Sequence, residues 1–304
     1  MRELVILGTA SQVPTRTRNQ NGYLLRWDGE GLLFDPGEGT QRQMIHAGVS
    51  ASQITRICLT HVHGDHCFGL PGVLSRMALD GAVHPVHLHY PASGEDVVRA
   101  LVSVSSPGID LRLHPHGGSG MVAPGLEIQP LKHRIETFGY RFTEPAGFTF
   151  LPDRLAAAGI TGTDIGVLQR EGSLGRVRLE DVTVSRPGQG FAFVMDTAPC
   201  EGAEELAHGV DLLVAESTFS DDDAGLAGEY LHLTAGQAGK LAASAAVGTL
   251  LLTHFSSRYG DGVTSLVRQA RDCAGGSAVL AANDLDQIAF PRRRPVLSSE
   301  SRNT

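Results

Sequence analysis

Four potential metal ligands stand within six residues of this chain, in the segment HVHGDH at residues 61–66. Neutral imidazoles and carboxylates are the groups with which proteins bind Zn²⁺ and similar divalent cations. The glycine in the segment permits the tight backbone path that aims successive side chains at one region. Four ligands at this spacing cannot all reach one ion. We therefore expect His61 and His63 to bind one cation, and Asp65 and His66 to bind a second.

Two cation sites need further ligands, and we expect these in loops at the ends of strands, where binding residues concentrate. The candidates are His133, after the apolar run 126–131, Asp196, after the run 191–195, and His254, after the run 250–253. Each of them alone could be an ordinary hydrogen-bonded residue at a strand end. The three together, in this order behind the first motif, favour a metal centre.

The elements that must position these ligands are strands alternating with helices. The run 54–60 has the β-branched and apolar character of a strand and ends in the histidine cluster, and a helical period follows over 69–79. The strand at 190–195 and the helix at 234–246 continue this alternation in the second half of the chain. Two halves of similar character predict an α/β fold, with two sheets packed together and helices outside.

Domain boundaries follow from composition. We expect a single domain over residues 1–290, interrupted at 151–189 by a protruding arm that holds one short helix and then a Gly-rich polar stretch with no core period. The polar end of the chain, 291–304, predicts a disordered tail.

Composition excludes several classes of protein. The formal net charge of −8 argues against coating of nucleic acid by bulk positive charge, and a hydrophobic fraction of 41% excludes a wholly disordered chain. The four cysteines form no CxxC pair, which argues against a disulfide framework and a thiolate zinc site. The first apolar run is too short for a signal peptide, and no apolar stretch approaches the roughly 18 residues of a membrane span. We expect a cytoplasmic protein that does not bind membranes.

The motif at residues 61–66 resembles the HxHxDH motif of the metallo-β-lactamase-fold hydrolases, and the segments around it are more specific. From about residue 2 to about residue 290 the chain resembles the tRNA 3′-processing endonuclease family, tRNase Z or ribonuclease Z. The segments that carry the resemblance are LGTASQVPTRTRN (7–19), LLFDPGEGTQRQM (32–44), LTHVHGDHCFGLPG (59–72), His133 with Gly139 and Tyr140, AESTF (215–219), HLTAGQA (232–238) and THFSSRY (253–259). The resemblance implies a four-layer αββα sandwich of two mixed β-sheets plus a small protruding arm.

The resemblance also implies a ligand set for two Zn²⁺ ions, with Mn²⁺ as an alternative. The implied ligands are His61, His63, His133 and Asp196 for the first ion, and Asp65, His66, Asp196 and His254 for the second. Asp196 would bridge the two ions. Asp35 resembles an aspartate that supports the ligands from behind; it could equally cap the turn before Pro36, and the two roles are compatible.

The implied reaction is hydrolysis of one phosphodiester bond, which removes the 3′ trailer of precursor tRNA next to the discriminator nucleotide and leaves a 3′-hydroxyl. Asp65 would ligate an ion and accept the proton of the attacking water. His232, kept protonated by Glu216, would donate a proton to the leaving 3′-oxygen; alternatively, it is a solvent-facing loop residue. The resemblance implies the short form of the enzyme and a homodimer, and we expect no DNA substrate.

Two rival functions stay open at this point. One is a different phosphodiesterase or small-ester hydrolase on the same fold. The other is a metal-free RNA-binding or scaffold protein, against which the full ligand set argues.

Further basic residues bear on the substrate. Arg16, Arg18 and Arg258 could contact phosphates near the cleaved bond, although surface arginines are usually only solvated. The resemblance implies that the arm at 151–189 binds tRNA, which bacterial relatives do with a Pro-Gly-rich turn and nearby lysines. Here Arg170 and Arg176 are the only basic residues of segment 159–176, which has no proline and no lysine, so this arm departs from the family pattern.

A second group of histidines lies at 84, 87 and 89, followed by two more at 114 and 116. His87 and His89 fall on one face of a predicted strand, but nothing in the sequence supplies the remaining ligands of a metal site. We interpret all five as structural or solvated residues.

Overall fold

The computed structural model describes residues 2–105, 108–260 and 262–293. The chain divides into two compact units. The first, which we call the body, comprises the residues up to 142 together with 190–291. The second comprises 143–189, which we call the insert, with the chain from residue 292 onward. The insert begins before the expected boundary at 151 because a strand that precedes this position pairs within the insert.

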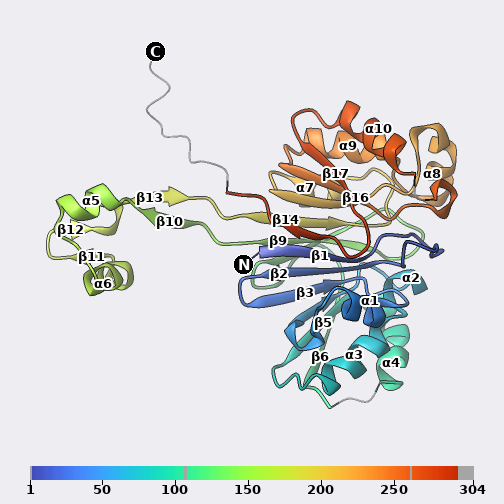
Figure 1. The fold of residues 1–304 in the computed structure, drawn as a ribbon, viewed down its shortest axis with the longest axis horizontal. Helices are drawn as coiled ribbons and strands as arrows, with labels where there is room; N and C mark the ends of the chain where they lie inside the picture. The colour runs from blue at the N-terminus through green and yellow to red at the C-terminus, as the bar shows by residue number, and fades with distance from the viewer. Residues whose placement is uncertain (1, 106–107, 261, 294–304) are drawn as a thin grey trace. The chain divides into compact units, whose positions relative to one another are not determined.

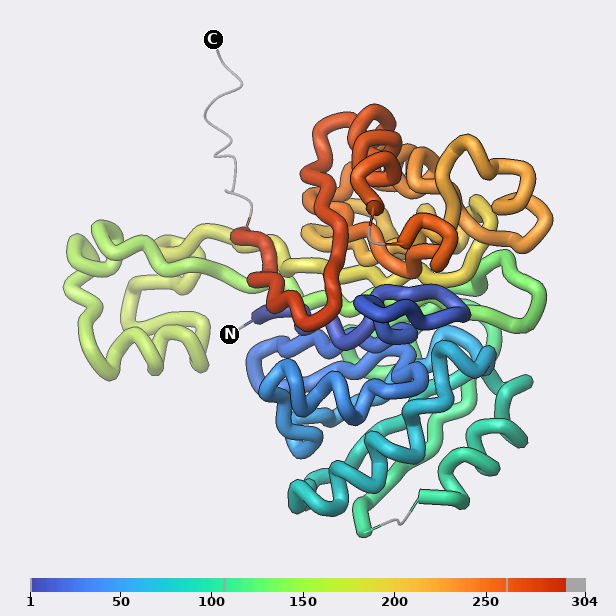
Figure 2. The backbone as a smooth tube through the Cα atoms, turned by 45° about the vertical axis from the view of Figure 1, so that its right-hand side comes forward, coloured from blue at the N-terminus to red at the C-terminus, as the bar shows by residue number. Residues whose placement is uncertain are grey.

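The first sheet of the body is mixed and has seven strands in the order β18-β1-β2-β3-β4-β5-β6. Strands β1, β2 and β3 pair antiparallel, and β3 to β6 pair parallel. The last strand of the body returns to the first, because β18 pairs antiparallel with β1, and Figure 2 shows this red segment beside the blue first strand. The strands are β1 (Arg2–Gly8), β2 (Gly22–Trp27), β3 (Glu30–Phe34), β4 (Arg56–Cys58), β5 (Val86–Pro91), β6 (Leu111–His116) and β18 (Gln287–Ala289).

The second sheet of the body also has seven strands, in the order β17-β16-β15-β14-β9-β8-β7. Its parallel half, β14 to β17, contains fully buried strands, as expected where helices cover one face and a second sheet covers the other. The strands are β7 (Gly120–Ala123), β8 (Leu126–Pro130), β9 (Phe138–Thr143), β14 (Gly190–Val194), β15 (Leu212–Glu216), β16 (Thr249–Thr253) and β17 (Ala278–Ala281).

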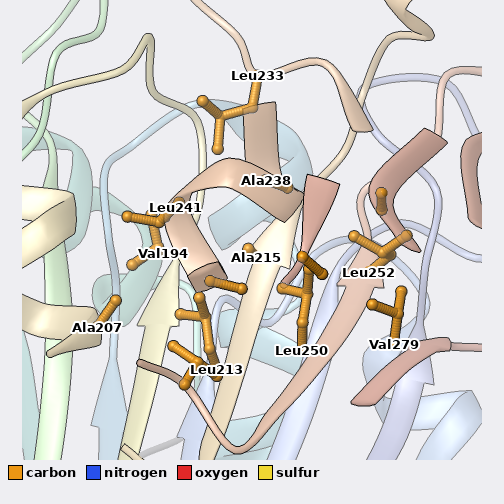
Figure 3. Close-up of a cluster of buried hydrophobic side chains, with 14 of the residues drawn as sticks. Val194, Ala207, Leu213, Ala215, Leu233, Ala238, Leu241, Leu250, Leu252 and Val279 are labelled. Atoms are coloured by element: carbon orange, nitrogen blue, oxygen red, sulfur yellow. The ribbon is translucent and has the colours of Figure 1, made fainter. Parts of the chain in front are cut away.

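The two sheets face each other and helices cover their outer faces, which makes four layers (Figure 1). An aromatic cluster that includes Phe34 and Phe193 fills the space between the sheets. A second apolar cluster packs β14 to β17 against helices α7, α9 and α10, with Leu241 of α9 over Val194 and Leu213 (Figure 3). A third joins the first sheet to α1, α3 and α4. The expected α/β fold of two mixed sheets is confirmed.

Along the chain, the helices alternate with strands. Helix α9 is preceded by a capping box, in which the side chains of Thr234 and Gln237 each accept a hydrogen bond from the backbone amide of the other. The helices of the body are α1 (Thr40–His46), α2 (Gly64–Cys67), α3 (Leu70–Leu79), α4 (Glu95–Ser103), α7 (Glu201–Ala207), α8 (Ala224–Tyr230), α9 (Ala235–Ser244) and α10 (Thr264–Cys273), with short 3₁₀ turns at Ala51–Gln53, Ala92–Gly94, Asp221–Asp223 and Ser257–Tyr259.

The insert has more structure than the sequence predicts. The expected short helix is present as α5, but the Gly-rich stretch behind it forms a second helix, α6, and a small hairpin. A core of its own, with Leu155 and Leu168 buried, explains why this polar segment folds. The elements are β10 (Gly147–Phe150), α5 (Pro152–Ala157), α6 (Thr163–Glu171), β11 (Ser173–Leu174), β12 (Val177–Arg178), a 3₁₀ turn at Leu179–Asp181 and β13 (Thr183–Arg186), with β10 and β13 paired antiparallel.

The expected tail lies mostly outside the described residues, which end at 293. Arg293 forms an ion pair with Glu144, so the start of the expected tail takes part in a defined contact. Among the described residues, no helix combines the length and the apolar character that crossing a membrane requires.

Candidate metal centre and active site

The predicted ligands meet where buried strands of both sheets end. Asp35 follows β3, Asp196 follows β14 after one further residue, and His254 follows β16. All three have positive φ angles, of 43°, 33° and 59° respectively, a region that residues other than glycine seldom adopt. Such strained backbone is typical of functional sites, because the surrounding fold must hold it.

The first group of ligand atoms belongs to His61, His63, His133 and Asp196, and these atoms all lie within 4.8 Å of one another. The Oδ2 atom of Asp196 lies 3.6 Å from His61 Nε2 and 3.8 Å from His133 Nε2. In His63, the ring nitrogen next to His61 is Nδ1 rather than Nε2, and it lies 2.9 Å from His61 Nε2. The structure thus brings together the four residues expected around one ion.

The second group belongs to Asp65, His66 and His254. Asp196 contacts this group through its other oxygen: Oδ1 lies 3.4 Å from His66 Nε2 and 3.1 Å from His254 Nε2. The Oδ2 atom of Asp65 lies 3.3 Å from His66 Nε2. Asp196 therefore stands between the groups and offers one oxygen to each, as a bridging ligand must.

Asp35 fixes two of the imidazoles from behind. Its carboxylate accepts hydrogen bonds from the amide and the hydroxyl of Thr60, both at 2.7 Å, and from His66 Nδ1 at 2.8 Å. The same hydroxyl lies 3.0 Å from His61 Nδ1 and can accept its proton. Since the Nδ1 atoms are engaged in this way, the Nε2 atoms of both rings are left to face the centre.

On the other side of the centre, hydrogen bonds hold the imidazoles of His254 and His133 in the same way. His254 Nδ1 lies 2.7 Å from the hydroxyl of Thr218, which donates to Glu216 Oε2 at 2.5 Å. His133 Nδ1 donates to the carbonyl of Leu231 at 3.2 Å. These imidazoles also direct Nε2 toward Asp196, so four histidines share one orientation imposed by their surroundings.

The donor set fits divalent cations. His133 Nε2, His254 Nε2 and Asp196 Oδ1 are buried and have no hydrogen-bond partner, which is costly unless a cation satisfies them. Burial lowers the pKa of His61 well below its usual value and also lowers that of His133, which favours the neutral ring that binds a metal. Burial opposes a charge on His66 as well, but Asp196 and the other carboxylates near it raise its pKa, so this centre attracts positive charge.

His232 lies beside the second group and has a partner of its own. Its Nδ1 donates to Glu216 Oε1 at 3.0 Å, and the same oxygen accepts the amide of Thr197 at 2.7 Å. Burial lowers the pKa of His232, but the charges of Glu216 and Asp196 and the hydrogen bond to Glu216 together raise it more, and the pKa rises to about 9. The ring is therefore held in its protonated form near neutral pH, ready to donate a proton.

Five of the expected ligands, together with Thr218 and His232, line a cavity of about 420 Å³. Arg258, one of the three arginines expected near the substrate, lies in its wall, and so does Arg134, which the sequence analysis did not select. The lining residues are Ser11, Gln12, Val13, His63, Asp65, His133, Arg134, Asp196, Thr218, Phe219, Tyr230, His232, His254, Ser256, Ser257 and Arg258.

The expectation for Arg18 is wrong. This side chain is buried, and its guanidinium donates inward, to the hydroxyl of Thr9 at 2.7 Å and to the carbonyl of Ala282 at 3.1 Å. It also lies over the ring of Phe255. Arg18 therefore braces the loop that it belongs to. Arg16 is exposed but is not among the residues that line the cavity.

The two arginines expected on the arm are exposed within the insert. Arg170 lies in the last turn of α6, and Arg176 lies in the turn between β11 and β12. Both are available to solvent.

Sequence reasoning missed the threonines that hold the imidazoles. Thr60 directly precedes the first ligand, and Thr218 stands two residues after Glu216. The available signal was a hydroxyl residue at the end of a buried strand beside a predicted ligand. It also missed Asn21, whose amide nitrogen lies 3.2 Å from His66 Nε2 and whose position no local pattern reveals.

Comparison with known proteins agrees with this geometry. The family model "Metallo-beta-lactamase superfamily" matches residues 15–140. A ribonuclease Z of Nocardia farcinica is 58% identical over 304 residues, covering 96% of this chain and 99% of its own length. One of Streptomyces avermitilis is 54% identical over 301 residues, with coverage of 96% and 99%.

Among solved structures, the short form of human tRNase Z superposes with a TM-score of 0.68 at 25% identity, covering 95% of this chain and 100% of its own. The fold, the His and Asp clusters typical of metallo-β-lactamase metal sites and the similarity along nearly the whole chain confirm the resemblance seen in the sequence. The chain belongs to the ribonuclease Z family of endoribonucleases, within the metallo-β-lactamase superfamily.

Proposed function

We propose that this protein removes the 3′ trailer of precursor tRNA in the cytoplasm by hydrolysing the phosphodiester bond after the discriminator nucleotide. The observation that carries the proposal is the position of Asp196, between two ligand groups that are flanked by the hydrogen-bonded pair of His232 and the buried Glu216. A centre that holds two cations next to a proton donor suits a phosphodiester, because its alkoxide leaving group must be protonated.

Two Zn²⁺ ions, or two Mn²⁺ ions, would be held by the two ligand groups with Asp196 shared between them. When bound, two divalent ions activate water and neutralise charge on the phosphoryl oxygens. The protein's own part is to orient the ligands: Asp35, Thr60 and Thr218 each hold an imidazole by its Nδ1 side. The oriented rings then need no rearrangement during the reaction.

Two residues of the chain would move protons. Asp65 lines the cavity and would accept the proton of the attacking water. Burial would raise the pKa of Asp65, but His66 and His254 hold it below its usual range, so it is a carboxylate at neutral pH. On the other side, His232 would donate its Nε2 proton to the leaving 3′-oxygen, while Glu216 holds Nδ1 and stabilises the charged ring.

Features outside the centre concern the tRNA as a whole. We propose that the insert contacts tRNA away from the cut, with Arg170 and Arg176 as its phosphate contacts. The insert has six acidic residues and five arginines over 143–189, so its affinity for tRNA would be lower than that of a basic arm. Arg16 is exposed and could also meet a phosphate.

We also propose that the protein is a homodimer. The family resemblance carries this proposal, and exposed apolar side chains on the body, such as Phe68 and Ile45, both 60% exposed, are accessible for a contact between subunits. Sedimentation equilibrium at micromolar concentrations tests the dimer, and a single species of monomer mass would contradict it.

One assay tests the proposed function. Zinc-loaded protein is incubated with a precursor tRNA that carries a 3′ trailer, beside the variants Asp65→Ala and His232→Ala, and the product ends are mapped. We expect one cut after the discriminator nucleotide, a 3′-hydroxyl on the tRNA, and greatly reduced cutting by both variants. If the wild type left this substrate intact and hydrolysed a small phosphodiester or ester rapidly, the protein would be another hydrolase of the same fold.

A further inference from the structure

A pair of exposed side chains, Arg134 and Tyr230, forms part of the cavity wall and has no part in the proposed proton transfers. Tyr230 is the last residue of α8 and is 41% exposed, which is unusual for a large ring. The guanidinium of Arg134 lies 4.9 Å from the centre of this ring, and its Nη2 donates to the carbonyl of Glu229 at 3.1 Å. Both residues line the same cavity as the ligand groups.

The backbone fixes this pair next to the proposed proton donor. Leu231, between Tyr230 and His232, has a φ of 58°, a left-handed conformation that is uncommon for a residue with a side chain. Its carbonyl accepts the hydrogen bond from His133. A ligand imidazole therefore holds the turn that sets Tyr230 and His232 side by side in the cavity wall.

A second aromatic residue links the pair to the centre. The ring of Phe219 lies 5.9 Å from that of His232 and 6.4 Å from that of Tyr230, to which it is nearly parallel. Arg258 covers it, with its guanidinium 5.3 Å from the ring centre. Two arginine–aromatic pairs thus line one part of the wall, and such planes are what proteins use to stack unpaired bases.

We propose that Arg134 and Tyr230 form a stacking platform for the base of the discriminator nucleotide, the one whose 3′-oxygen leaves. This inference rests on the proposed function, in which His232 protonates that oxygen. The nucleotide that carries the leaving oxygen must then lie on the His232 side of the centre, where Tyr230 stands, and the trailer must leave on the other side. Since every base has a π-face, the platform accepts all four bases.

The test combines protein variants with substrates that lack one base. Precursor tRNA is prepared intact, with an abasic discriminator nucleotide, or with an abasic first trailer nucleotide. Each is cut under single-turnover conditions by the wild type, Tyr230→Ala, Tyr230→Phe and Arg134→Ala, with Arg99→Ala as a control because Arg99 is an exposed arginine on α4, outside the cavity lining. Thermal unfolding of each variant checks that it is folded.

We expect Tyr230→Ala to lower kcat/KM on intact substrate about tenfold or more, with Tyr230→Phe close to the wild type. The abasic discriminator should slow the wild type by a similar factor and should make Tyr230→Ala and wild type equal. Arg134→Ala should show a smaller loss that also vanishes with this substrate, and Arg99→Ala should show none.

Two outcomes would overturn the platform while leaving the proposed function intact. One is equal cutting of intact substrate by Tyr230→Ala and wild type. The other is a loss in Tyr230→Ala that persists with the abasic discriminator, or that disappears instead with the abasic trailer nucleotide. Failure of the proposed function differs from both, because the wild type itself would then leave precursor tRNA uncut.

Discussion

The described part of the body contains two groups of histidines, and only one of them has its ring nitrogens arranged to bind cations. The first, which we call the centre histidines, comprises His61, His63, His66, His133 and His254. The second, the edge histidines, comprises His87, His89, His114 and His116 on the neighbouring strands β5 and β6 at the edge of the first sheet. Both groups contain buried ring nitrogens without a hydrogen-bond partner.

The groups differ in where the nitrogens point. Centre histidines lie beyond strand ends, His66 in the short helix α2 and the others in loops, and their ligand atoms converge around Asp196. Edge histidines lie within strands and stack: His89 and His114 have nearly parallel rings 4.9 Å apart, and His87 Nδ1 lies 2.8 Å from His114 Nε2. Among the described residues, no three potential ligand atoms of the edge group come together. A metal centre therefore requires ligand atoms that converge on one region and a carboxylate among them. A high number of histidines is not enough.

The largest expected effect separates the two groups directly. Asp196→Asn removes the charge shared by both ligand groups, so metal content should fall and cleavage of precursor tRNA should drop by more than about 1,000-fold. Elemental analysis and single-turnover cleavage measure the two quantities. The edge variant His114→Asn should keep both within about twofold of the wild type, as surface changes outside a site usually do. Equal losses of metal content and cleavage in Asp196→Asn and His114→Asn would contradict the distinction between the centre histidines and the edge histidines.

A smaller effect is expected where a histidine near the centre binds no metal. His232→Asn should lower the cleavage rate roughly 100-fold, because the leaving oxygen loses its proton donor, and should leave the metal content unchanged. Rate and metal content measured on the same sample decide this. Loss of metal together with rate would make His232 a ligand instead.

The hydrogen bonds behind the centre rings should matter less again. Thr218→Val keeps the shape of the side chain and removes the hydroxyl between His254 and Glu216, which should weaken metal affinity or activity about tenfold. Competition with a chromogenic chelator measures the affinity. If affinity and activity both stayed at wild-type level, the hydroxyl would have no part in orienting His254.

The edge group should affect stability rather than activity. Both ring nitrogens of His89 are buried and unpartnered, so His89→Leu should raise the free energy of unfolding at pH 7 by about 1 to 3 kcal/mol. Urea unfolding measures this change. Cleavage should remain at the wild-type level.

The same residue predicts a pH dependence. Burial, with the nearby charges of His114 and Arg56, lowers the pKa of His89 to about 3 in the folded protein. The unfolded chain therefore binds this proton first, near pH 6.5, and stability should fall as the pH drops from about 6.5 toward 3, by up to about 1.4 kcal/mol per pH unit. His89→Leu should show a shallower slope, and an unchanged slope would contradict the assignment.

The sequence predicted the parts of this molecule that depend on local pattern. The buried run 190–195 is β14, the period at 234–246 is α9, and the ligands at strand ends meet because strands of both packed sheets end beside the centre. The ligands of the centre were predictable for the same reason, whereas Thr60, Thr218 and Asn21, which contact their imidazoles, were missed.

What could not be predicted depends on contacts between distant residues. Burial of Arg18 is decided by Ala282 and Phe255, more than 200 positions away, and no local signal contains them. Strand β18 exists because it pairs with β1 at the other end of the chain. The platform of Arg134 and Tyr230 likewise joins two segments that only the fold brings together.

The central claim, that the groups around Asp196 hold the cations of an endoribonuclease, has a direct test in an anomalous-difference map recorded at the zinc absorption edge from crystals of the zinc-loaded protein. We predict two peaks per chain, one bounded by His61, His63 and His133 and the other by Asp65, His66 and His254, with Asp196 between them. A single peak, or strong density between His87 and His114 with none beside Asp196, would contradict the account.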